Sequence, residues 1–76
     1  MSEDVRRMVG RNVRRLRIAA GLSQAELAER MGVDRAYVSG LELGQRNPTI
    51  DTLDRIAEAL GLVIGPIFSE KPARRR

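Results

Sequence analysis

Apolar residues recur every three or four positions in four separate stretches of this 76-residue chain, which is the spacing of amphipathic helices. The stretches run over about 4–20, 24–31, 35–43 and 50–60. Their apolar stripes comprise Val5, Val9, Val13, Leu16 and Ala20, then Leu27, Ala28 and Met31, then Val38 and Leu41, and finally Ile50, Leu53, Ile56, Ala57 and Leu60. This spacing predicts an all-α domain. Because only two residues of the chain are aromatic, we expect its core to be aliphatic.

Polar residues and glycines predict where the second and third helices begin and end. Ser23 is followed three residues later by Glu26, which is the pattern of a capping box. Gly32 fits the left-handed position that ends a helix, and Asp34 fits the first cap of the next one. Two helices joined by so short a turn should cross steeply, so we expect a helix-turn-helix over about 24–43.

The C-terminal third of the chain is less regular. The segment "GQRNPT" has the composition of a loop, and its Thr49 is expected to cap the fourth helix. The segment "LVIGPIF" is ambiguous, although Pro66 fits the first position of a short fifth helix that carries Ile67 and Phe68. We expect one domain over 1–69, followed by a disordered basic tail over 70–76.

Charge and composition narrow the classes of function. Fourteen Lys and Arg against ten Asp and Glu give a net charge of +4, which suits a nucleic-acid partner but also serves solubility. The chain has no histidine, no cysteine and no glycine-rich phosphate loop, so we expect no enzyme, no metal and no cofactor. It also has no membrane-length apolar run, no signal-peptide pattern and no room for an effector domain. We therefore expect a cytoplasmic, nucleoid-associated protein with neither a membrane partner nor a small-molecule ligand.

Most of the chain resembles the Cro/repressor-type, or XRE-like, helix-turn-helix family. The most specific elements are "LSQAELA", the "GV" turn, Glu42-x-Gly44, "NPT" and the closing "IAEALGL". The stretch "DRAYVSGLE" is similar to the controller proteins of restriction–modification systems. The resemblance covers about 9–68 and implies a compact, lambda-repressor-like five-helix bundle. It also implies binding of double-stranded DNA as a homodimer on a pseudo-palindrome, with the third helix in the major groove.

The third helix supplies the expected contacts to DNA bases. If Val38 and Leu41 face the core, the positions that point away from it are Ala36, Ser39, Gly40 and Leu43. Arg35 lies at the tip of this helix and could hold guanine O6 and N7 together, while Ala36 suits a thymine methyl and Ser39 suits almost any base. The competing interpretation of Arg35 is a solvated tip or a phosphate clamp. Gly40 and Leu43 depart from the polar residues more usual in the family, so DNA shape is expected to supply part of the specificity.

Four further residues are expected at the DNA backbone. They are Gln24, Tyr37, Arg46 and Asn47. Gln24 opens the second helix, where an anion is favoured, although a plain polar helix start would look the same. The hydroxyl of Tyr37 could reach a phosphate while its ring packs, but a purely structural tyrosine fits equally well. Arg46 lies in the loop after the third helix and could also enter a minor groove.

The resemblance assigns a structural role to one ion pair. It pairs Arg17 with Glu42 as a partly buried salt bridge between the first and third helices. Loss of Arg17 is then expected to lower stability, because Glu42 would lose its partner.

Apolar residues near the C-terminus predict a dimer surface. Ile64, Ile67 and Phe68 add more apolar area than one small core requires, so we expect a two-fold interface there. The alternative is that they close the monomer core.

Together these features favour a sequence-specific transcriptional regulator, and an activator of this kind would also contact RNA polymerase. The alternatives are an antitoxin or adaptor that mainly binds another protein, and a nonspecific basic coat on DNA. Acidic residues on the predicted helices argue against the coat.

Overall fold

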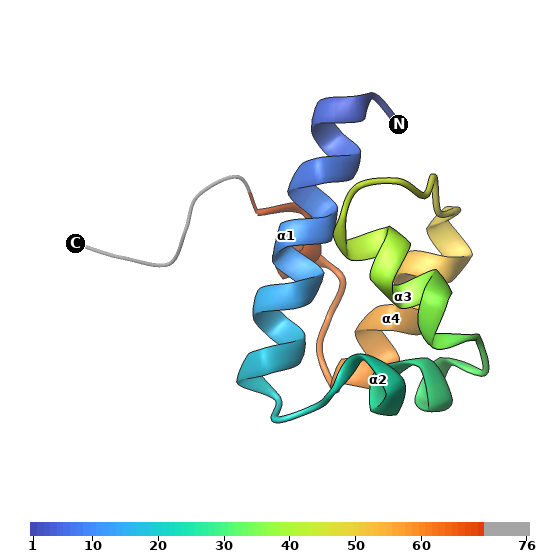
Figure 1. Ribbon diagram of the computed structural model, residues 1–76. Helices are drawn as coiled ribbons and strands as arrows, with labels where there is room; N and C mark the ends of the chain where they lie inside the picture. Colours follow the sequence, from blue (N-terminus) through green and yellow to red (C-terminus); the bar gives the residue numbers. More distant parts are fainter. Residues whose placement is uncertain (70–76) are drawn as a thin grey trace.

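The computed structural model describes residues 1–69, and all regular elements in this range are helical (Figure 1). Its elements are α1 (Glu3–Ala19), α2 (Gln24–Met31), α3 (Arg35–Glu42), α4 (Ile50–Leu60) and the 3-10 turn η1 (Gly65–Phe68). The long α1 stands beside the three shorter helices (Figure 1). The expected tail over 70–76 lies outside the described residues.

The expectation of five helices is wrong in one respect, because the fifth element is a short 3-10 turn. Only four residues lie between Ile64 and Ser69, and one of them is Pro66, which has no backbone N–H to donate. The N–H of Ile67 bonds to the carbonyl of Ile64 at 3.0 Å, three residues back. Such i to i−3 bonds are characteristic of short 3-10 pieces. The all-helical class is confirmed.

The predicted caps place the helix starts, with one exception. Ser23 Oγ accepts from the N–H of Glu26 at 3.0 Å, and Glu26 Oε1 accepts from the N–H of Ser23 at 2.7 Å, which completes the capping box. Thr49 likewise accepts from the N–H of Thr52 at the start of α4. Asp34 has the extended backbone of a cap, but its side chain makes no capping hydrogen bond to α3.

The core lies where the four stripes meet and is aliphatic, as expected. The buried apolar residues are Val9, Val13, Leu27, Ala28, Met31, Val38, Leu41, Leu53, Ile56, Ala57, Leu60 and Ile67. Two residues assigned to the stripes are instead exposed, namely Ala20 and Ile50. Ala20 lies beyond the last residue of α1 and Ile50 is the first residue of α4, so both lie at the ends of their stripes, outside the core.

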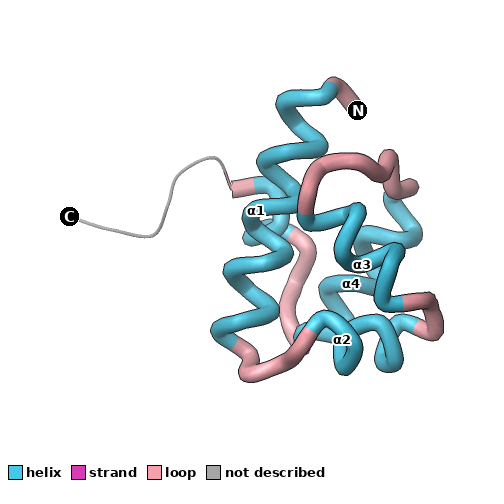
Figure 2. Tube along the Cα trace, viewed as in Figure 1, coloured by secondary structure: helices cyan, strands magenta, loops and turns pink. Residues whose placement is uncertain are grey.

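Two close approaches fix α1 against the rest of the fold. A β-carbon at Gly10 would lie 2.5 Å from the carbonyl oxygen of Leu41, so α1 meets the backbone of α3 directly. The buried Asn12 donates from Nδ2 to the carbonyls of Ile67 and Ser69, at 2.8 Å each. These bonds hold η1 against α1. The loop that leads from α4 to η1 runs alongside α1 (Figure 2).

Candidate nucleic-acid interface

The turn between α2 and α3 determines how α3 is presented. Gly32 has a φ of +73°, a conformation that side chains disfavour, and its N–H bonds to the carbonyl of Glu29. The N–H of Val33 bonds to the carbonyl of Ala28 at 3.0 Å, which completes a Schellman ending. The chain therefore leaves α2 and enters α3 within three residues, and the tip of α3 projects at the surface (Figure 1).

The three residues expected at DNA bases share the outward side of α3. Arg35 and Ala36 are exposed, and Ser39 is half-buried one turn further along the helix. Leu43 continues this side and is 64% exposed. The residues come together by helical periodicity alone, because positions three and four apart lie on the same face. A contiguous surface of mixed donor and apolar character thus runs along α3.

Gly40 faces away from the aliphatic core, but the side chain of Arg46 covers it. It is buried, and a β-carbon there would lie 3.0 Å from Arg46 Nε. The guanidinium carbon of Arg46 lies 5.3 Å from the ring centroid of Tyr37, within the range of a cation–π contact. Arg46 therefore lies along α3, and the Tyr37 ring both packs against the core and supports this cation.

A shallow hollow of about 500 Å³ lies beside the first turn of α3. It is lined by Gly32, Val33, Asp34, Ala36, Tyr37 and Arg46. The hollow places the Arg46 cation close to Ala36, one of the positions expected to contact bases. It is open to solvent, as a surface that receives a large partner would be.

Two of the polar residues expected at the DNA backbone have partners within the protein. Gln24 Nε2 donates to Glu42 Oε1 at 3.0 Å, so one face of this amide is directed inward. Asn47 is exposed, and its Oδ1 accepts from the amino group of Met1 at 3.1 Å. A primary amide carries two donor hydrogens and an acceptor oxygen, so each side chain retains capacity for a further contact.

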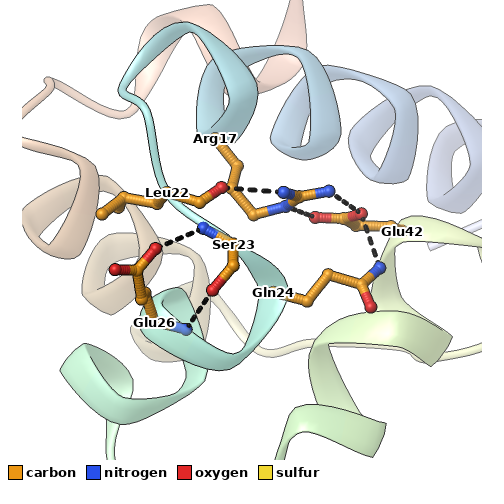
Figure 3. Close-up of polar contacts among 6 residues, drawn as sticks. All are labelled: Arg17, Leu22, Ser23, Gln24, Glu26 and Glu42. Carbon is orange, nitrogen blue, oxygen red and sulfur yellow. Dashed lines mark hydrogen bonds and ion pairs between the residues drawn. The ribbon is translucent and has the colours of Figure 1, made fainter.

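The ion pair implied by the resemblance is present and buried. Arg17 Nε donates to Glu42 Oε2 at 2.6 Å and Arg17 Nη2 donates to Glu42 Oε1 at 3.1 Å, with side-chain exposures of 10% and 3% (Figure 3). Arg17 Nη1 also donates to the carbonyl of Leu22 at 2.8 Å. The hydrogen bonds that Arg17 donates to the Glu42 carboxylate raise the pKa of Arg17 despite the opposing effect of burial. With Gln24 on the same carboxylate, this network ties α1, α2 and α3 together.

The residues expected at a dimer surface are not equivalent. Ile64 and Phe68 are half-buried and retain accessible area. Ile67 is wrong as an interface residue, because it is 0% exposed and fills the core of its own protomer. The neighbouring Val63, by contrast, is 77% exposed, and Leu62 is 38% exposed.

Sequence reasoning missed the role of Asn12 and the packing of Arg46 against Gly40. A signal for Asn12 existed, because it is a polar residue three positions after Val9 on the buried side of α1. No comparable signal marked Gly40, because its neighbour Arg46 lies in a loop whose path a helical pattern does not predict.

Among residues 1–69, no group of acidic, histidine or cysteine side chains could hold a metal ion. No helix in this part of the chain is long and apolar enough to cross a membrane.

Comparison with known proteins adds independent findings. A family model described as helix-turn-helix (HTH_3) matches residues 13–63. An uncharacterised HTH-type transcriptional regulator of Sinorhizobium fredii is 49% identical over 59 residues, which are 78% of this chain and 77% of the relative. Control protein C.BamHI of Bacillus amyloliquefaciens is 35% identical over 63 residues, or 82% of this chain and 78% of that protein.

The chain is also similar to solved structures. The crystal structure of the restriction–modification controller protein C.AhdI from Aeromonas hydrophila superposes with a TM-score of 0.83 at 39% identity. The match covers 87% of this chain and 96% of that one.

Proposed function

The chain belongs to the XRE-type helix-turn-helix family, and on this premise we propose that it is a sequence-specific transcriptional regulator that binds double-stranded DNA through α3. One observation carries the proposal. The outward side of α3 presents Arg35, Ala36 and Ser39 at the surface, while its inner side is fixed to α1 by the buried pair of Arg17 and Glu42. A rigid helix with an accessible polar tip is what readout of base edges in a major groove requires.

Arg35 is the main base reader in this proposal. Its guanidinium can donate two parallel hydrogen bonds to guanine O6 and N7, which is worth about 1–3 kcal/mol of discrimination. Ala36 contacts a thymine methyl, and Ser39 hydrogen-bonds to a base edge or to a nearby phosphate. The short list of side chains leaves a share of specificity to the shape of the DNA.

The flanking residues hold the DNA backbone. Arg46 and Tyr37 lie together beside the hollow at the start of α3, and Asn47 is exposed in the same loop. Gln24 opens α2, where the helix dipole favours a phosphate. These contacts set the register of α3 on the duplex and carry no sequence information directly.

A homodimer places two copies of α3 about 34 Å apart on one face of DNA, which matches a pseudo-palindromic operator. Ile64 and Phe68, with the exposed Leu62 and Val63, form the proposed two-fold surface. Sedimentation equilibrium tests it with Val63→Asp, and Ile18→Asp serves as a matched control because Ile18 is 52% exposed on α1. Val63→Asp should weaken the dimer and Ile18→Asp should not. A monomeric wild type at tens of micromolar contradicts the dimer.

The likeness to C.BamHI and C.AhdI supports a finer proposal, that the regulated genes belong to a restriction–modification system. If so, the operator should lie upstream of such genes in the genome of origin. An operator found only beside unrelated genes would refute this finer assignment and leave the DNA-binding function intact.

The deciding experiment is a selection of bound duplexes from random DNA at near-physiological salt. The wild type should enrich an inverted repeat whose half-sites are about one helical turn apart. Arg35→Ala should lose preference at a guanine of each half-site, whereas the control Arg14→Ala, an exposed arginine on α1, should keep it. Absence of any enriched sequence would refute the proposal and favour a protein partner.

A further inference from the structure

We infer that Gly40 is a positioning residue: by having no side chain, it provides a seat that holds Arg46 along α3 and directs its guanidinium to the DNA-facing hollow. The role of DNA in this inference rests on the proposed function. The seat itself is a property of the free protein and can be tested without DNA.

The backbone after α3 brings Arg46 back toward the helix. Gly44 has a φ of +78°, its N–H bonds to the carbonyl of Leu41, and the N–H of Gln45 bonds to the carbonyl of Gly40 at 2.8 Å. This Schellman ending reverses the chain direction at the end of α3. The residue that follows the reversal is Arg46, so its side chain starts beside the last turn of the helix.

The side chain then runs along α3 toward its N-terminus. The three heavy atoms nearest to a β-carbon at Gly40 all belong to Arg46: Nε at 3.0 Å, Cγ at 3.5 Å and Cδ at 3.7 Å. The guanidinium carbon lies over the ring of Tyr37, which is three residues before Gly40 and thus one turn nearer the tip. Gly40 and Tyr37 therefore form two successive supports under one long side chain.

This arrangement explains why a loop arginine reaches the reading end of α3. Arg46 lines the same hollow as Ala36, although ten residues separate them in sequence. An arginine held in one conformation before binding loses less conformational freedom on contact with a phosphate or a base edge. Gly40 thereby raises affinity for DNA without touching the DNA itself.

Replacement of Gly40 by alanine separates this role from a structural one. The new methyl group would crowd Arg46 Nε at 3.0 Å, and this displaces a flexible side chain rather than backbone. Alanine is also the better helix former, so the thermal midpoint of Gly40→Ala should equal or exceed that of the wild type. We expect unchanged or higher stability together with weaker binding to the operator.

The binding test is a double-mutant cycle on the operator that the wild type selects. Arg46→Ala should weaken binding by about 10- to 100-fold, the loss of a charge-assisted hydrogen bond. Gly40→Ala alone should weaken it by about threefold to tenfold, and by less than about twofold when Arg46 is already alanine. Wild-type affinity in Gly40→Ala would overturn the inference. An equal loss in both backgrounds would also overturn it, because Gly40 would then act through close approach of its own backbone to DNA.

A measurement on the free protein distinguishes failure of the seat from failure of the proposed function. The δ-methylene protons of Arg46 should resonate upfield in the proton NMR spectrum, because the Tyr37 ring lies beneath this side chain. The upfield shift should vanish in Tyr37→Leu and shrink in Gly40→Ala. If Gly40→Ala retains the full shift, the seat does not exist. If the seat is present and the wild type selects no DNA, the proposed function fails instead.

Discussion

Replacement of Arg17 by alanine is the most direct test of how α3 is held. The change removes three hydrogen bonds, two to the carboxylate of Glu42 and one to the carbonyl of Leu22. It leaves Glu42, with 3% side-chain exposure, bonded to the amide of Gln24 at 3.0 Å. A buried charge that loses its partner is strongly destabilising, because the remaining ion is desolvated without compensation.

The magnitude follows from that geometry. Breaking a buried ion pair from one side costs about 3–5 kcal/mol, and the lower end applies here because the vacated arginine volume admits water to Glu42. A domain of this length has a free energy of unfolding of about 4–11 kcal/mol. Arg17→Ala should therefore remove about 3 kcal/mol, equivalent to a fall in the melting midpoint of about 12–24 °C.

Urea denaturation followed by far-UV circular dichroism measures the effect. All variants are compared at one protein concentration, because association with a second copy would raise the apparent stability. Arg14→Ala is the matched control, since it removes an exposed arginine from the same helix. The double variant Arg17→Met with Glu42→Leu should recover most of the loss, because it leaves no unpaired charge. The reasoning is refuted if the free energies of unfolding of Arg17→Ala and Arg14→Ala differ by less than about 0.5 kcal/mol.

Two further predictions concern the helix start of α2 and the packing of α1. Hydrogen bonds from Ser23, chiefly from its backbone N–H and secondarily from its hydroxyl, hold the pKa of Glu26 below its ordinary value of 4.5. The ionised carboxylate therefore stabilises the fold at pH values above 4.5. This stabilisation is lost as the pH falls through the lowered pKa. Urea midpoints at about pH 7 and about pH 3 should differ more for the wild type than for Glu26→Gln, and equal differences would disprove the linkage. Gly10→Ala should lower stability by about 1–3 kcal/mol, because its methyl group would lie 2.5 Å from the carbonyl oxygen of Leu41. Gly65→Ala, whose methyl group meets nothing within 4 Å, should leave the melting midpoint nearly unchanged, and a similar loss in both variants would contradict the packing argument.

The parts of the fold that depend on local chemistry could be predicted from the sequence. The capping box of Ser23 and Glu26 and the left-handed Gly32 involve residues a few positions apart, so their spacing determines the geometry. These signals placed both ends of α2. The pairing of Arg17 with Glu42 is different, because it joins residues 25 positions apart and came only from the family resemblance.

The parts that depend on tertiary packing could not be predicted in this way. Ile67 has the apolar character of either a core or an interface residue, and only the position of η1 against α1 shows that the core occupies it. Gly40 was expected only to point away from the core, because a helical wheel contains no information about a loop side chain that folds back over it. The contacts of the base-reading residues with DNA remain predictions, because they depend on a second molecule.

The uneven attachment of α3 has a consequence for how such a regulator diversifies. The end of α3 near Glu42 is buried against α1, whereas the end at Arg35 and Ala36 is exposed. Random changes at the exposed end are nearly neutral for the free energy of unfolding. If Arg35 and Ala36 contact bases as proposed, drift can sample new operator preferences without loss of soluble protein. Changes at the buried end are removed by selection whatever DNA the protein binds. Lineages of this fold should thus acquire new target genes through the first turn of one helix, on a scaffold that stays constant.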